Sequence, residues 1–161
     1  MNKNELVTSL NTSRQRLVDA INDLSDLEQI EPGPDGGWSV KDILAHLAAC
    51  EAELVTALAR DVAHNKPPRL WGISEAEVEK QNTQWHGENK DRPLDRVRDD
   101  FAGVRKQLLR QVAALNDKDL TDPKKYKWLD GKTLADYIAG EAAGHDDDHV
   151  EGLRNWRADH A

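Results

Sequence analysis

Apolar residues recur at three- and four-residue steps through four long stretches of the chain, with polar residues between them. The first stretch covers residues 3–28, and its apolar positions are Leu6, Leu10, Leu17, Ile21, Leu24 and Leu27. This spacing predicts an amphipathic helix with one buried face. Residues 31–37 follow with two prolines and three glycines, and such a composition predicts a loop.

A second helix is predicted to begin at Ser39, which forms a Ser-x-x-Asp capping box with Asp42 and follows Trp38, placed as a hydrophobic staple. The apolar face of this helix consists of Val40, Ile43, Leu44, Leu47, Leu54, Val55, Leu58 and Val62. His46 lies at the flank of this face, and Glu51 lies near its centre. Because a buried carboxylate is costly unless it is paired, protonated or bound to a cation, Glu51 needs a partner or a hydrated place near an open end.

The middle of the chain predicts a connection, a short helix and a third long helix. Residues 64–73 contain two prolines and predict a connection. Ser74 and Glu77 then begin a short helix that ends at about residue 85, and Pro93 interrupts the pattern. The third long helix covers residues 94–115, with apolar positions at Leu94, Val97, Phe101, Val104, Leu108, Leu109, Val112 and Leu115. Residues 116–131 predict a loop.

The fourth long helix is predicted to follow the cap formed by Thr133 and Asp136 and to run over residues 134–156 without interruption. An advance of about 100° per residue places one stripe of side chains toward the core. Its members are Ile138, Glu141, Ala142, His145, His149, Gly152 and Trp156. In the same projection, Asp146 and Asp147 point toward solvent. The two histidines therefore occupy inward positions one helical turn apart.

Four amphipathic helices joined by loops predict an all-α fold, a four-helix bundle with a short extra helix between the second and third long helices. The 161 residues are the size of one domain, so we expect residues 1–161 to form a single domain.

Composition and charge narrow the range of partners. The formal net charge is −8, and the averaged field of an acidic protein repels phosphate backbones, so we expect no nucleic-acid partner. There is no apolar run near 18 residues and no signal peptide, which predicts a cytoplasmic protein with no membrane partner. A single cysteine, Cys50, excludes an intramolecular disulfide and fits a reducing compartment.

Three histidines form the candidate metal site. The Cβ atoms of His145 and His149, at i and i+4 on one helix, are expected to lie about 5 to 6 Å apart, from which two rings can reach one metal ion. Facing helices in a bundle are about 8 to 10 Å apart, so His46 can join them. Three neutral imidazoles bind zinc with one position open, and nickel or iron also accept nitrogen ligands. The alternative is a set of buried histidines hydrogen-bonded to polar neighbours.

If a metal binds, Glu51 is the expected general base, with Glu53 and Glu141 as alternatives. Cys50 lies one turn after His46, where it either lines a pocket as a thiol or fills a small space in the core.

Several motifs resemble a known superfamily. The segment WSVKDILAHL at residues 38–47 is similar to the opening of the second helix in the DinB-like superfamily of metal-binding four-helix bundles, and His145-x-x-x-His149 resembles the histidine pair of its fourth helix. Within the superfamily, the order of four further features resembles the ClbS/DfsB group: Asn82, Trp128, the Gly-Lys-Thr-Leu turn at residues 131–134, and the terminal sequence HDDDHVEGLRNW.

The resemblance implies that His46, His145 and His149 form the three-histidine metal site of the superfamily. It also implies a metal-dependent hydrolase or thiol transferase that acts on a small reactive metabolite, and a homodimer. The resemblance to the ClbS/DfsB group implies, more narrowly, hydrolytic opening of a strained, DNA-damaging electrophile as self-protection. The alternative function is non-catalytic binding or sequestration of a small molecule. Bulky aromatic residues are common in the superfamily where this chain has Cys50 and Asp146.

Overall fold

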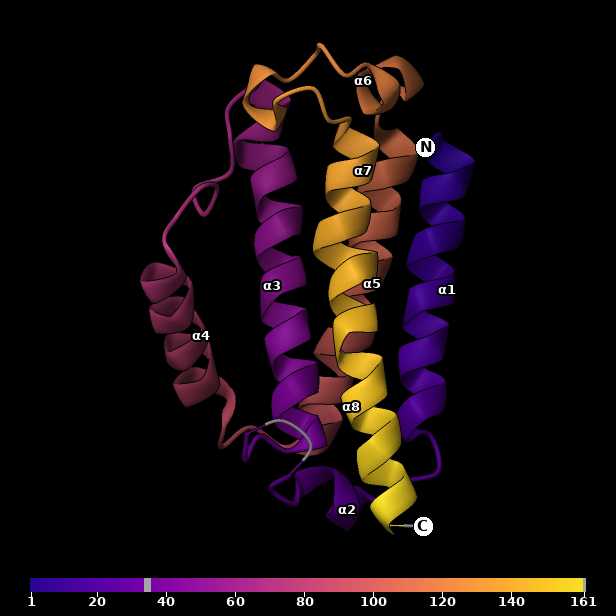
Figure 1. Cartoon of the computed structure of the whole chain (residues 1–161), viewed down its shortest axis with the longest axis vertical. Coiled ribbons are helices and arrows are strands. Elements are labelled where there is room, and N and C mark those ends of the chain that lie inside the picture. Colours follow the sequence, from indigo (N-terminus) through magenta and orange to yellow (C-terminus); the bar gives the residue numbers. More distant parts are fainter. Residues whose placement is uncertain (34–35, 161) are drawn as a thin grey trace.

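The structure is a computed structural model that describes residues 1–33 and 36–160. Within these residues, four long helices lie side by side (Figure 1). They are α1 (Lys3–Ile21), α3 (Val40–Arg60), α5 (Leu94–Ala114) and a composite fourth helix made of α7 (Leu134–Ile138), the π-helical segment η3 (Ala139–Gly144) and α8 (His145–His160). Helix α4 (Glu75–Asn89) lies outside the bundle, beside α3. The predicted all-α bundle with one extra helix is therefore confirmed.

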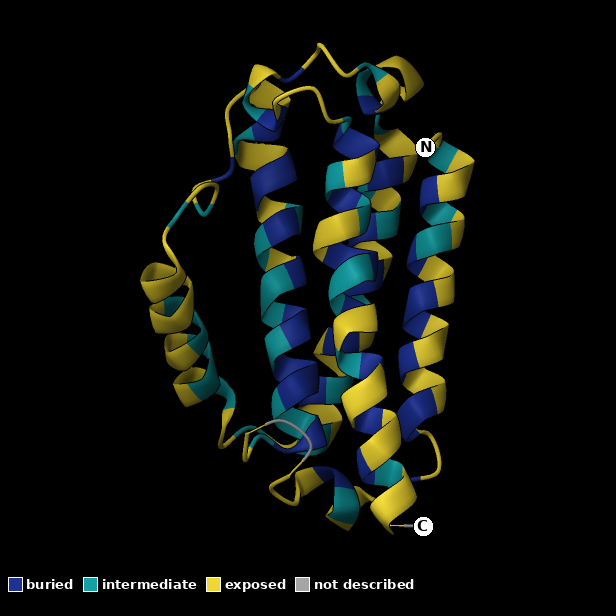
Figure 2. Ribbon diagram, viewed as in Figure 1, coloured by how far each residue is buried: buried dark blue, intermediate teal, exposed yellow. Residues whose placement is uncertain are grey.

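Buried residues lie on the inner faces of the long helices, whereas most residues on their outer faces are exposed (Figure 2). They form two apolar clusters. One contains Leu17, Ile43, Leu44, Val97, Phe101 and Leu153, and the other contains Leu6, Leu10, Leu54, Leu108, Leu134 and Ile138, each among others. On each long helix, one buried charged residue lies between the residues of the first cluster and those of the second. Among the described residues these are Arg14, Glu51, Arg105 and Asp146. The core is thus divided by a charged layer.

The first helix ends earlier than its apolar pattern predicts. Helix α1 ends at Ile21, and Ser25 begins a separate short helix, α2 (Asp26–Ile30), through a reciprocal capping box with Glu28. Leu27 is consequently 73% exposed, so its predicted place on the buried face was wrong. The Ser-x-x-Glu motif outweighs the apolar periodicity because it satisfies two backbone N–H groups at a new helix start.

The predicted connections contain more structure than expected. Residues 62–64 form the short 3₁₀ helix η1 (Val62–His64), and the predicted loop at 116–131 contains α6 (Asp117–Thr121) and η2 (Lys127–Leu129). Of the predicted loop at 31–37, residues 34 and 35 lie outside the described residues. The capping box predicted at Ser39 and the helix start predicted at Ser74 are confirmed. In the described part of the chain, no helix has the length and apolar character needed to cross a membrane.

The fourth helix is not one continuous α-helix, and this changes which side chains face the core. A π-helical segment holds about one more residue per turn than an α-helix, so the residues that follow η3 are rotated by about one position. The buried positions are Ile138, Ala142, Ala143, Asp146, Val150, Leu153 and Trp156. From residue 142 to residue 153, each is one residue later than predicted. The predicted exposure of Asp146 was wrong: it is 1% exposed, while Asp147 is exposed as expected.

Candidate metal centre

Three histidines from two helices meet at the flank of the bundle. His46 on α3 lies opposite His145 and His149 on α8, and the Nε2 atoms of His46 and His145 are 3.1 Å apart. One ring nitrogen from each of the three histidines lies within 4.8 Å of the others. The π-helical segment places the two α8 histidines at the edge of the core rather than at its centre, so all three rings are partly buried. The structure thus brings together the three residues that the sequence selected.

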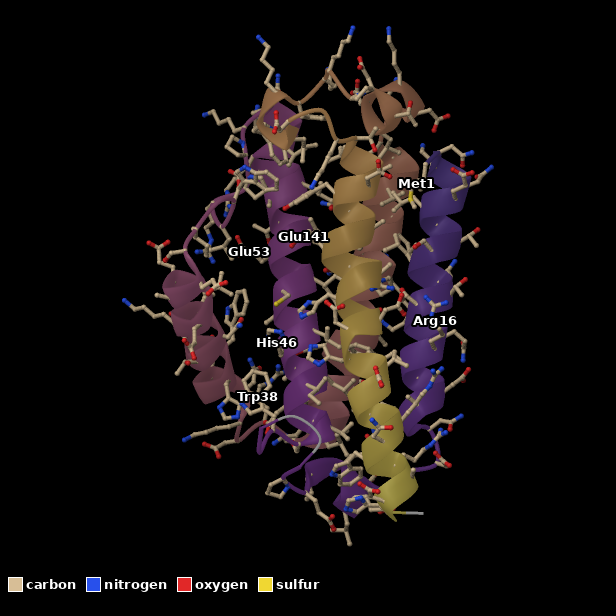
Figure 3. All side chains as sticks on the ribbon, in the orientation of Figure 1. Met1, Arg16, Trp38, His46, Glu53 and Glu141 are labelled. Atoms are coloured by element: carbon tan, nitrogen blue, oxygen red, sulfur yellow. The ribbon has the colours of Figure 1, made fainter. Side chains whose placement is uncertain are left out.

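The aromatic ring of Trp38 fixes one side of this cluster. It packs edge-on against His46, with ring centroids 5.4 Å apart, and stacks almost parallel to His86 of α4 at 5.0 Å. Trp38 immediately precedes the Ser39 cap of α3, so the same residue that marks the start of the helix also orients the histidine. Figure 3 shows Trp38 and His46 on the side of α3 that faces α4.

Burial favours the neutral form of two of these imidazoles. Desolvation, together with repulsion from the nearby His145 and His149, lowers the pKa of His46 to about 4. Desolvation also lowers the pKa of His145, again assisted by His149. A neutral imidazole offers a lone pair to a metal ion without first releasing a proton. The rings of His46 and His145 are therefore available as metal ligands at neutral pH.

The low pKa of His46 predicts a loss of stability in acid. In the unfolded chain this imidazole takes up a proton near its ordinary value of 6.5, but in the folded protein only near 4. Its contribution is therefore fully present above pH 6.5 and is lost as the pH falls toward 4, by roughly 2 kcal/mol after allowance for partial exposure. Urea unfolding of metal-free protein across this range should show a steeper loss for wild type than for His46→Gln. His64→Gln is the matched control, because His64 is exposed. If the free energy of unfolding fell equally steeply with pH in wild type and in His46→Gln, the prediction would be contradicted.

The geometry of the cluster fits a divalent metal. Two nitrogens that each lie about 2.0 to 2.1 Å from a tetrahedral zinc ion are about 3.3 Å from one another. The separation of 3.1 Å between His46 and His145 is close to this value, and a small rotation of the rings brings the third donor, within 4.8 Å, into the same range. Uncharged nitrogen donors of this kind suit zinc, nickel and iron better than magnesium or calcium.

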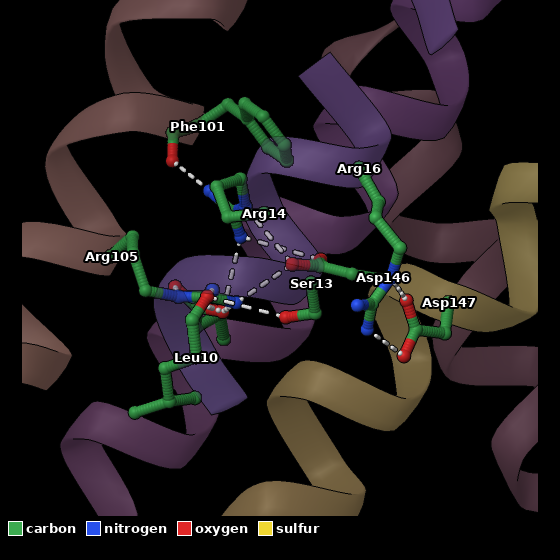
Figure 4. A network of polar contacts seen from close by, with 9 residues as sticks. Leu10, Ser13, Arg14, Arg16, Phe101, Arg105, Asp146 and Asp147 are labelled. Carbon is green, nitrogen blue, oxygen red and sulfur yellow. Dashed lines mark hydrogen bonds and ion pairs between the residues drawn. The ribbon is translucent and has the colours of Figure 1, made fainter. Parts of the chain in front are cut away.

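Glu51 belongs to a buried ion-pair network with Arg14 and Arg105, not to the histidine cluster. Figure 4 shows Arg14, Arg105 and Asp146 of this network. Both carboxylate oxygens of Glu51 accept hydrogen bonds from Arg105, at 2.6 to 3.1 Å, and one also accepts from Arg14. The partner that this core carboxylate required is thus a pair of arginines rather than a metal or bulk water. Because its oxygens are occupied by guanidinium groups, we do not retain our hypothesis that Glu51 is the general base.

The network closes through Asp146, the aspartate that follows the first α8 histidine. Its carboxylate accepts hydrogen bonds from Arg14 and Arg105, each at 3.0 Å. Each arginine also donates to a backbone carbonyl, Arg14 to Phe101 and Arg105 to Leu10. The network therefore connects α1, α3, α5 and α8 at the level of Asp146, the residue next to His145.

Sequence reasoning missed this network. Arg14 lies between Leu10 and Leu17 on the apolar face of the first helix, and Arg105 follows Val104 on the third. Two arginines at core positions, together with the core carboxylate Glu51, were the signal that could have revealed it. The position of Asp146 had no such signal, because it depends on the π-helical segment.

A cavity of about 520 Å³ lies next to the histidines, between α3, α4 and the fourth helix. His46, His145 and Cys50 line it, together with Glu53 and Glu141 and the residues Leu54, Trp71, Asn82, Trp85, Tyr137 and Asp148, among others. Glu141 lines the cavity with an exposed side chain, and partial desolvation by the surrounding protein raises its pKa. The two alternative bases named from the sequence, Glu53 and Glu141, thus line the cavity together with a third carboxylate, Asp148.

Cys50 and two tryptophans also take defined places in this cavity. The sulfur of Cys50 lies 3.8 Å from Nε2 of His46, and burial together with neighbouring carboxylates raises the pKa of its thiol to about 12. Cys50 is therefore a protonated wall residue in the metal-free protein. Trp71 and Trp85 line the cavity as well.

This bundle with its flanking histidines defines the class of protein. The DinB superfamily model matches residues 9–152, so the chain belongs to the DinB superfamily. No curated protein matches the chain by sequence.

Solved structures narrow the resemblance within that class. The Sibling Lethal Factor Precursor DfsB superposes with a TM-score of 0.83 at 18% identity, covering 99% of this chain and 97% of its own. The colibactin self-resistance protein ClbS, in complex with a dsDNA, superposes with a TM-score of 0.80 at 16% identity, covering 97% of this chain and 95% of its own. An uncharacterised protein from Escherichia coli UTI89 superposes with a TM-score of 0.79 at 16% identity, covering 99% of this chain and 94% of its own. The predicted likeness to the ClbS/DfsB group is confirmed at the level of the fold.

Proposed function

We propose that this protein binds a divalent metal through His46, His145 and His149 and acts on a small molecule held in the adjacent cavity, as a metal-dependent hydrolase or thiol transferase. The observation that carries this proposal is the convergence of three imidazoles from α3 and α8, of which those of His46 and His145 line a cavity of about 520 Å³. A cavity of this volume is within the range that holds a drug-sized ligand.

The residues of the cavity divide the chemistry between them. A divalent metal, when bound, lowers the pKa of coordinated water to near 7 or activates a thiol. Glu141 is the proposed general base, because it lies one helical turn before His145, faces the cavity and has a raised pKa. Asn82 and Tyr137 offer hydrogen bonds that orient a substrate at the same wall.

A second candidate function is sequestration without turnover. The contact of 3.1 Å between Nε2 of His46 and Nε2 of His145 is also the geometry of a hydrogen bond between two neutral rings. In that case the histidines would be polar residues of a binding pocket, and the protein would protect by holding a reactive small molecule. Because ClbS has been seen with duplex DNA, such DNA belongs among the ligands to be tested.

Metal analysis tests the first function directly. Protein purified without an affinity tag should contain close to one equivalent of zinc, nickel or iron, and His145→Ala should lose most of it. The matched control is His64→Ala, because His64 is exposed on η1 and is not part of the cluster. Equal and near-zero metal in wild type and His145→Ala would contradict the proposed metal site.

Thermal unfolding separates the two functions. A shift produced by divalent metal that disappears in His46→Ala supports the metal site, since a ligand that binds only the folded state raises its stability. A response to small organic molecules alone supports sequestration. A response to duplex DNA that persists in His46→Ala would indicate a DNA surface separate from the histidines.

A further inference from the structure

Two aromatic rings form a corner in the wall of the cavity. The rings of Trp71 and Tyr137 both line it, with centroids 5.5 Å apart and planes inclined at 72°. Trp128 packs edge-on against both rings, at 5.0 and 5.5 Å, and holds the corner in place. Nearly perpendicular rings of this kind can present their negative faces to one positively charged group.

Carboxylates surround the same corner. Glu141 follows Tyr137 by one helical turn, and Glu53 approaches from α3 (Figure 3). Burial raises the pKa of the Tyr137 hydroxyl, and the charges of Glu141 and Glu53 add to this effect. Asp148, two turns after Glu141, also lines the cavity.

The charge of the cavity is one-sided. Glu53 is ion-paired with Arg69 at 2.8 Å, but within residues 1–33 and 36–160 neither Glu141 nor Asp148 has an ion-pair partner. In the described part of the protein, no lysine or arginine is among the residues that line the cavity. In the metal-free protein, a negatively charged ligand would therefore meet uncompensated carboxylates, whereas a cation would be attracted by both the carboxylates and the rings.

We propose that the corner formed by Trp71, Tyr137 and Glu141 binds the ammonium group of a small organic cation, such as an alkylated amine. The ammonium would lie against the two rings with Glu141 as its counter-ion, and the rest of the ligand would extend along the cavity toward His46 and His145. This inference names the ligand class of the site in the proposed function and rests on that function for the role of the ligand as substrate.

Three probes of the same shape and different charge test the proposal. Choline carries a quaternary ammonium, 3,3-dimethylbutan-1-ol is its neutral isostere, and 3,3-dimethylbutanoate is an anionic analogue. Calorimetric titration of the full chain should give choline roughly tenfold tighter binding than the neutral isostere, in line with a partly exposed cation–π contact that is assisted by the carboxylate of Glu141. The anion should bind more weakly than either.

Variants assign the preference to this corner. Glu141→Gln keeps the shape of the side chain and removes its charge, so it should reduce the preference for choline several-fold. Trp71→Leu should also reduce it. Glu151→Gln is the matched control, because Glu151 is an exposed glutamate on α8 that does not line the cavity. Equal binding of choline and its isostere, a preference for the anion, no detectable binding of choline, or an unchanged preference in Glu141→Gln would overturn the proposal.

Metal content measured on the same preparations distinguishes this inference from the proposed function. Histidine-dependent metal without a preference for choline overturns the cation site alone. A preference for choline in both wild type and His145→Ala supports the cation site, and if both preparations also contain near-zero metal as purified, the metal site alone is overturned.

Discussion

Replacement of Asp146 by alanine is expected to lower the free energy of unfolding by about 3 to 5 kcal/mol, the usual cost of removing one member of a buried ion-pair network. The side chain is 1% exposed and accepts hydrogen bonds from both Arg14 and Arg105. Without it, two buried guanidinium groups share the single carboxylate of Glu51. Urea unfolding followed by far-ultraviolet circular dichroism measures the change.

The neighbouring aspartate is a matched control. Asp147 also forms an ion pair, with Arg16 at 2.8 Å, but both side chains are more than 40% exposed. An exposed pair contributes about 0 to 1 kcal/mol, so Asp147→Ala should be nearly neutral. A second variant, Asp146→Asn, keeps the size of the side chain and removes only its charge. If Asp146→Ala and Asp147→Ala had the same small effect, the network would not be a major source of stability.

This network also connects the fold to the site. Asp146 is adjacent to His145, and its contacts with arginines from α1 and α5 fix the rotation of α8 about its own axis. That rotation decides whether His145 and His149 face His46 or the interior of the core. We therefore expect Asp146→Asn to weaken metal binding even under conditions in which the protein remains folded.

Insertion of one alanine after Gly140 is expected to have an even larger effect. If η3 keeps its geometry, the added residue would rotate α8 by about 100° relative to α7. His145 and His149 would move to the core positions now held by Asp146 and Val150, and Asp146 would leave its arginines. We expect a loss on the order of 4 kcal/mol or more, or failure to fold, because the charged layer and the apolar packing are disrupted together.

Substitution at the same position is the control. Gly140 is exposed, and a Cβ atom added to it meets no atom within 4 Å. Gly140→Ala should therefore stabilise the protein slightly, by about 0.5 to 1 kcal/mol, because alanine loses less backbone entropy in a helix. Calorimetric unfolding of both variants checks the pair. An insertion variant with wild-type stability and wild-type metal content would show that the register of the helix through η3 does not set the position of the histidines.

The local part of the fold was predictable from the sequence. The capping boxes at Ser39 and the cap at Thr133 mark helix starts that the structure has at the same residues, because a cap depends only on a few neighbouring residues. Periodicity of apolar residues gave the long helices and most of their buried faces. The motifs around His46 and His145 were sufficient to indicate the DinB superfamily, to which the chain belongs.

Other features depended on interactions between helices. Periodicity assumes a constant turn per residue, so it could not predict the π-helical segment or the one-residue shift that follows it. The partners of Glu51 could not be predicted from the sequence either, since they lie on α1 and α5, 37 and 54 residues away in the chain. The sequence by itself determined where helices begin, which faces are apolar and which histidines can share a metal. Only the tertiary structure decided the rotation of α8, because it depends on two buried arginines that need a carboxylate from another helix.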